Sequence, residues 1–170
     1  PLIDRSTDGR ENLRKAWETI FRRASAKGVQ TCLHLHSTAD ELFWEIESVR
    51  IIESHVDDPI YKTKATKTRL EKTDKFLKAS ICIADFDQLI KNNITMTSRE
   101  TLSESAINEK IAEAWRNINV KISPTTFLED VYVMKNRLLK IVEQFGVERI
   151  PYAGPECGLK GFPTYECAIE

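Results

Sequence analysis

The segment Tyr152–Pro163, with the sequence YAGPECGLKGFP, governs the interpretation of the chain, because an apolar run leads into it and one cysteine lies at its centre. The apolar run begins at Val147 and predicts a buried strand, and the glycines and prolines after it predict a loop. Functional groups of parallel α/β proteins lie where strands end and loops begin. Cys157 therefore indicates a metal ligand or a nucleophile, the alternative being a structural turn in which a small thiol fills a gap.

Apolar runs and helical periodicity upstream of this segment predict three further strands and several helices. The expected strands are 29–35, 49–53, 77–84 and 147–152. The stretch 6–9 predicts an N-cap for a first helix whose periodic residues run from Leu13 to about residue 27. The further expected helices cover about 38–46, 61–76, 99–117 and 127–145. Strands that alternate with helices predict an α/β fold with a parallel sheet. Four strands make either a small open sheet or half of a (β/α)8 barrel, which needs eight.

Length and composition favour a single domain and exclude several classes of protein. The chain has 170 residues and a formal net charge of −1, with no run of 18 apolar residues, so we expect neither a nucleic-acid partner nor a membrane span. The first residues carry no secretory signal and no initiator methionine, which predicts a processed chain or a fragment. Four widely spaced cysteines favour a reducing, cytoplasmic location over a disulfide framework.

Candidate metal ligands follow three of the four predicted strands. His34 and His36 close the first strand and project to the same face, Glu53 ends the second, and Cys157 follows the fourth. Imidazole, carboxylate and thiolate donors suit Zn²⁺, so these four residues are the predicted ligand set. His55 is an alternative to His36, because it also lies near the end of the second strand.

Other reactive motifs are missing or ambiguous. The sequence has no glycine-rich phosphate loop and no Gly-x-Ser-x-Gly elbow, which removes support for nucleotide binding and for that hydrolase chemistry. Asp85 and Asp87, after the third predicted strand, are the remaining candidates for acid, base or positioning roles, although such carboxylates are often turn formers and caps.

The residues 154–160, GPECGLK, resemble the end of the catalytic domain of cobalamin-independent methionine synthases, where an Asp-Cys-Gly-Leu-Lys stretch supplies a zinc-binding cysteine. His34-Leu35-His36-Ser37 resembles that family's His-x-Cys zinc motif, and Val49–Ser54 resembles the next strand, whose glutamate is a ligand. Order and spacing agree over about 28–162, with an insertion at about 99–125. The chain therefore resembles the C-terminal half of the family's (β/α)8 barrel.

The resemblance implies a zinc-dependent methyltransferase of methionine synthesis. Zinc would activate homocysteine or another small thiol for methylation by a methylcorrinoid or a methylated folate. A partner chain or a missing N-terminal segment would supply the other half of the barrel, and an exposed sheet edge predicts oligomers.

Two departures from the family pattern bear on this implied function. His36 stands where the family has a cysteine, which makes the shell less anionic and the bound thiolate less nucleophilic. Asp85-Phe86-Asp87 replaces the family's Asp-x-His, which weakens the case for a folate donor and makes the short archaeal relatives that use a corrinoid the closer comparison. A metal-free decarboxylase of the same barrel superfamily and a non-catalytic half-barrel scaffold are the alternatives.

Overall fold

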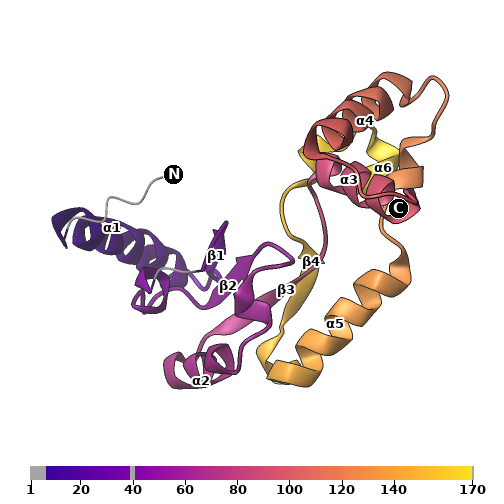
Figure 1. The fold of residues 1–170 in the computed structure, drawn as a ribbon. Helices are drawn as coiled ribbons and strands as arrows, with labels where there is room; N and C mark the ends of the chain where they lie inside the picture. Colours follow the sequence, from indigo (N-terminus) through magenta and orange to yellow (C-terminus); the bar gives the residue numbers. More distant parts are fainter. Residues whose placement is uncertain (1–6, 39–40, 170) are drawn as a thin grey trace. The chain divides into compact units, whose positions relative to one another are not determined.

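The structure, a computed structural model, describes residues 7–38 and 41–169 and shows an α/β fold (Figure 1). Four strands form one sheet in the order β1-β2-β3-β4, with the bounds β1 Cys32–Leu35, β2 Ile51–Ser54, β3 Phe76–Cys82 and β4 Tyr152–Pro155. The six helices of the described residues are α1 Thr7–Ser25, α2 Lys64–Thr73, α3 Phe86–Thr97, α4 Glu104–Asn117, α5 Val131–Phe145 and α6 Tyr165–Ile169. The predicted fold of parallel strands alternating with helices is confirmed.

The chain forms two compact units. Of the described residues, the first unit comprises 7–38, 41–80 and 137–154, and the second comprises 81–136 and 155–169. Ser6, the first residue of the predicted N-cap stretch 6–9, and residues 39–40 lie outside the described residues. Among the described residues, no helix has both the length and the apolar character that crossing a membrane requires.

The core of the first unit lies beneath the parallel sheet. β1 and β2 pair in parallel, as do β2 and β3, and this register places Ile52 beside Leu77. Both side chains are fully buried, together with Leu42, Ile46, Val49 and Leu70. This apolar layer fixes one face of the sheet in the core, so alternate residues of the same strands project to the opposite face.

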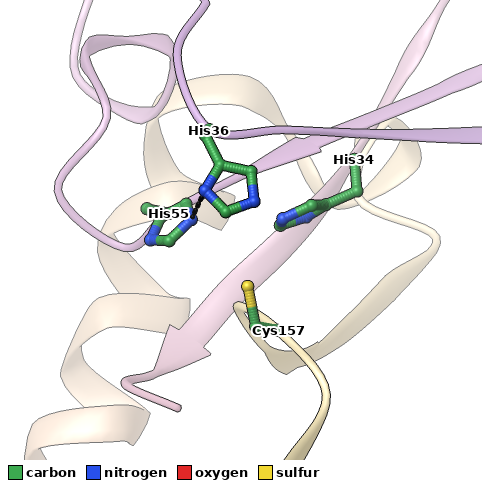
Figure 2. A group of neighbouring side chains, drawn as sticks. All are labelled: His34, His36, His55 and Cys157. Carbon is green, nitrogen blue, oxygen red and sulfur yellow. Dashed lines mark hydrogen bonds between the residues drawn. The ribbon is translucent and has the colours of Figure 1, made fainter. Parts of the chain in front are cut away.

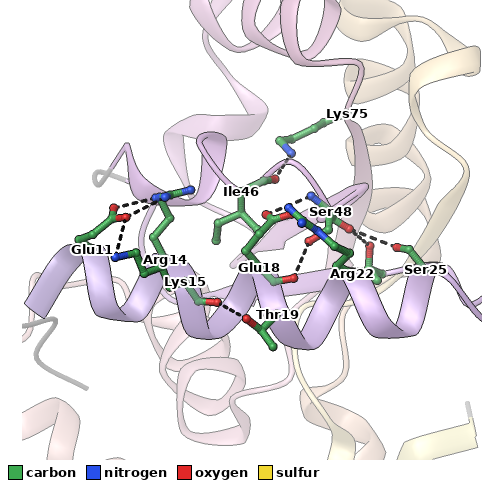
Figure 3. A network of polar contacts seen from close by, with 11 residues as sticks. Glu11, Arg14, Lys15, Glu18, Thr19, Arg22, Ser25, Ile46, Ser48 and Lys75 are labelled. Carbon is green, nitrogen blue, oxygen red and sulfur yellow. Dashed lines mark hydrogen bonds and ion pairs between the residues drawn. The ribbon is translucent and has the colours of Figure 1, made fainter.

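Polar side chains attach α1 to the segment that precedes β2 (Figure 3). Ser48 N–H donates to Glu18 Oε2 over 3.3 Å, and the Thr31 hydroxyl donates to Ser48 O over 2.6 Å.

Lys75, only 2% exposed, donates from Nζ to Ile46 O over 2.6 Å and to Val49 O over 2.7 Å. A buried cation thus satisfies two carbonyl groups that lie outside any strand or α-helix.

The core of the second unit is built around α3. Phe86, Leu89 and Ile90 lie at helical spacing on one side of α3, and all three are buried. The Phe86 ring contacts the rings of Phe127 and Phe162, at centroid separations of 6.1 and 5.5 Å. Aromatic packing therefore joins segments of this unit that lie far apart in the sequence.

The predicted helix 38–46 is wrong over its described residues, which contain only a 3-10 helix, Leu42–Trp44. Leu42, Ile46 and Val49 have helical spacing, but the Ile46 and Val49 carbonyls accept hydrogen bonds from Lys75 instead of continuing a helix.

The sequence analysis also missed α3 and α6, and it placed the last strand too early. A 3-10 helix occupies Val147–Arg149, because Gly146 has φ +89° and redirects the chain, and β4 begins only after Pro151.

Candidate metal centre

Three polar side chains form a row across β1, β2 and β3 on the face opposite the apolar layer. The register aligns His34 with Glu53 and Ile52 with Leu77, so Lys78 comes next beside Glu53. His34 Nδ1 lies 3.2 Å from Glu53 Oε1, and Lys78 Nζ lies 2.5 Å from Glu53 Oε2. The side chain of Glu53 is 12% exposed, so the carboxylate is partly dehydrated and held from both sides.

His36 and His55 bring two further imidazoles to His34 from just beyond the ends of β1 and β2. Figure 2 shows the three rings turned toward one another. The ring centroids are 5.1 Å apart for His34 and His36, 5.7 Å for His34 and His55, and 4.6 Å for His36 and His55. His36 is exposed and the other two are half-buried, so the cluster borders solvent.

The separation of two ring nitrogens fits a shared metal ion. His36 Nδ1 and His55 Nε2 lie 3.1 Å apart. Two nitrogens bound to one tetrahedral zinc at about 2.0–2.1 Å are separated by about 3.3 Å. The two rings, hydrogen-bonded to each other in the structure, therefore need only a small adjustment to bind one ion.

A buried polar network lies beneath the ends of the same strands. The Ser54 N–H donates to the Tyr61 hydroxyl over 3.0 Å, and this hydroxyl donates to Lys78 O over 2.9 Å. Ser54 Oγ lies 2.7 Å from Leu35 O and 2.8 Å from Asp58 Oδ2. One network thus fixes Ser54, the residue between Glu53 and His55.

Tyr61 and Asp58 are functional candidates that the sequence analysis did not identify. Tyr61 is 4% exposed, and burial raises the pKa of its hydroxyl above the usual value, which keeps the group protonated and able to donate. Asp58 caps the 3-10 helix Pro59–Tyr61 by accepting from Ile60 N–H over 2.8 Å, and it also accepts from Thr38. An Asp-Pro pair after a strand signals such a cap, but the partner hydroxyl is visible only in the fold.

In the second unit, the residue before Cys157 is fixed to the end of β3. Glu156 N–H donates to Cys82 O over 3.1 Å, and its Oε1 accepts from Ala84 N–H over 3.1 Å. Glu156 is 4% exposed, and this buried carboxylate anchors the loop that carries the half-buried Cys157. The role of Glu156 was not anticipated, although a glutamate directly before a candidate ligand was a signal available in the sequence.

Two of the predicted ligands, His34 and His36, belong with His55 to a group of side chains in the first unit that could hold a metal ion (Figure 2). Cys157 belongs to the second unit, so its place in the same ligand set stays a prediction. The group includes His55, which the sequence analysis gave only as an alternative to His36. Glu53 lies beside His34 and outside this group, so its direct coordination stays a prediction.

The predicted catalytic aspartates have structural partners in the second unit. Asp85 is the N-cap of α3 and accepts from Gln88 N–H over 3.2 Å, and Asp87 accepts from Trp115 Nε1–H over 2.6 Å. Each carboxylate thus has a structural hydrogen-bond donor, and a catalytic role for either residue stays a prediction.

Comparisons with known proteins found no matching family model, no matching curated protein and no matching solved structure.

Proposed function

We propose that this chain binds a zinc ion through His34, His36, His55 and Cys157 and activates a small thiol for methyl transfer. The observation that carries the metal-binding part is the convergence of three imidazoles, two of whose nitrogens lie 3.1 Å apart. The methyltransferase part depends on the resemblance of residues 154–160 and of the two strand ends to methionine synthases.

The donor chemistry favours zinc among the common divalent ions. Three neutral imidazoles and one thiolate are nitrogen and sulfur donors of the kind that zinc binds in proteins, whereas magnesium and calcium prefer oxygen. Imidazole and thiolate also bind copper and nickel, so the proposal commits to zinc on the tetrahedral spacing described above.

Zinc at this centre would lower the pKa of a bound thiol, so that the thiolate is present at neutral pH. The chain's own part is to hold the imidazoles in place through the network at Ser54 and Tyr61, and to leave the exposed His36 edge open to solvent. Homocysteine is the proposed acceptor, and a methylcorrinoid is preferred to a methylated folate as donor, because Asp87 stands where the family has a histidine.

The number of protein ligands favours a second candidate function, a structural zinc site. Four protein donors are typical of closed structural centres, whereas catalytic centres keep one position for water or substrate. Under the proposed activity, the incoming thiol must therefore expand the coordination shell or displace one protein ligand, and the exposed His36 is the ligand we expect to leave.

Metal content is the first test. We expect about one zinc per chain in protein purified without added metal, measured by elemental analysis, and loss of that zinc in Cys157→Ser and in His55→Ala. Cys32→Ser is the matched control, because Cys32 is a thiol on β1 outside the ligand group. A folded, metal-free wild-type protein that takes up no added zinc would refute both candidate functions.

Cobalt substitution then separates the two functions. Addition of homocysteine to the Co²⁺ protein is expected to produce a new sulfur-to-cobalt charge-transfer band, followed by methionine formation when methylcobalamin is supplied. A cobalt spectrum that homocysteine leaves unchanged would support the structural site and would contradict thiol activation.

A further inference from the structure

We infer that Glu53 is a positioning residue for the metal ligand His34, and that Lys78 holds the Glu53 carboxylate in that role. The inference depends on the proposed metal site and assigns Glu53 to the surroundings of the ion instead of to its ligand shell. It concerns three residues placed side by side by the register of β1, β2 and β3.

The two carboxylate oxygens of Glu53 have separate partners. Oε1 lies 3.2 Å from His34 Nδ1, and Oε2 lies 2.5 Å from Lys78 Nζ. A carboxylate that bound the metal through either oxygen would have to weaken one of these contacts. In the observed arrangement, the contact with Nδ1 leaves the other ring nitrogen of His34, Nε2, for the metal ion.

A histidine ligand commonly donates its second ring N–H to a carboxylate, which fixes the tautomer and makes the ligating nitrogen more basic. Glu53 Oε1 lies 3.2 Å from Nδ1, but the pair does not have hydrogen-bond geometry in the structure, so this role requires the His34 ring to turn toward Oε1 when the ion binds. Its side chain is 12% exposed and that of Lys78 is 24% exposed, so the ion pair is shielded from water and is stronger than a surface pair. Lys78 therefore holds the Glu53 carboxylate beside His34.

The two possible roles of Glu53 predict opposite effects of Lys78→Met. If Glu53 positions His34, removing Lys78 loosens the carboxylate and lowers the affinity for the metal ion. If Glu53 is a ligand, Lys78 competes with the metal for the carboxylate, and its removal raises the affinity. Loss of the Lys78 charge also reduces repulsion of a cation under either role, so only a lower affinity in Lys78→Met discriminates, and it supports positioning.

The experiment is a Co²⁺ titration of the metal-free full chain and of the Lys78→Met, Glu53→Gln and Glu53→Ala variants. Positioning predicts a loss of about tenfold to a hundredfold in affinity for Glu53→Ala and a smaller loss for Glu53→Gln and Lys78→Met. It also predicts that the visible Co²⁺ spectrum keeps its band positions and intensity in all three variants, because the ligand shell is unchanged. An altered spectrum in Glu53→Gln or an unchanged affinity in Glu53→Ala would overturn the inference.

A measurement without metal keeps this test separate from the proposed function. Nitrogen-15 NMR of the metal-free protein is expected to show His34 in the Nδ1–H tautomer, and Glu53→Ala is expected to shift its tautomer balance. Failure of the wild-type chain to bind Co²⁺ would reject the proposed function. A His34 ring without the Nδ1–H tautomer in metal-binding protein would reject the positioning role alone.

Discussion

Lys75 allows a quantitative prediction about the stability of the first unit. Its ammonium group is 2% exposed and donates to two backbone carbonyls, and burial lowers its pKa from the ordinary value of 10.5 to about 8. Between these pH values the unfolded chain holds a proton on Lys75 that the folded chain has released. Lys75 therefore makes the free energy of unfolding larger as pH rises from about 8 to 10.5, and smaller again as pH falls through the same interval.

The size of this contribution follows from the same interval. Each pKa unit corresponds to about 1.4 kcal/mol, so the full contribution of Lys75 is about 3 kcal/mol. Below pH 8 the lysine is charged in both states and contributes no pH dependence. The predicted effect is thus confined to the alkaline side of neutrality.

The assay is urea denaturation of the metal-free chain at several pH values between 7 and 10.5, with wild type compared with Lys75→Met. The difference in unfolding free energy between the two proteins isolates Lys75 from the other groups that titrate in this range. We expect the wild type to gain about 3 kcal/mol relative to the variant across the interval. Lys72→Met, which changes an exposed lysine in the last turn of α2, should follow the wild-type pH dependence. Parallel curves for wild type and Lys75→Met would refute the reasoning, because they would show that burial does not displace the proton equilibrium.

Further substitutions test the polar network, one cap and one glycine. Tyr61→Phe removes the acceptor of the buried Ser54 N–H and should lower the free energy of unfolding by about 1–3 kcal/mol, measured by urea denaturation; no loss would contradict the network. Asp85→Ala should cost about 1 kcal/mol through the α3 cap, whereas Asp85→Asn, which also caps, should cost a few tenths; equal costs would argue against capping. Gly146→Ala should cost about 1–3 kcal/mol by thermal or urea unfolding, since φ +89° and ψ 143° suit only glycine, and wild-type stability would refute that strain.

The alternation of strands and helices could be predicted because each element has its own spacing of apolar residues in the sequence. The apolar residues of β2 and β3 stand in runs that end at polar residues, and those runs gave the strands to within a few positions. The last strand was displaced because Val147 is apolar yet 71% exposed, so hydrophobicity alone misplaced it. Helix α3 was missed although Asp85 and the buried Phe86, Leu89 and Ile90 carry a recognisable cap and spacing.

The candidate site was predictable as a set of strand ends but not as a geometry. His34, His36 and Cys157 could be selected because soft donors at the ends of parallel strands converge. The inclusion of His55 beside His36 depends on the 3.1 Å approach of its Nε2 to His36, and that contact is set by the register of two strands, which no local pattern encodes. The same register determines that Glu53 lies between His34 and Lys78.

The bond between the Ser54 amide and the Tyr61 hydroxyl has a consequence for hydrogen exchange. This amide is fully buried and bonded to a side chain, so its deuterium uptake reports the opening of the strand end that carries Glu53 and His55. His36, by contrast, is exposed at the edge of the cluster. A metal ion could leave or enter at that edge by rotation of the His36 ring alone. We therefore expect exchange of the metal ion to be much faster than hydrogen–deuterium exchange at the Ser54 amide. We therefore expect the proposed centre to gain and lose a metal ion while the strands beneath it stay closed.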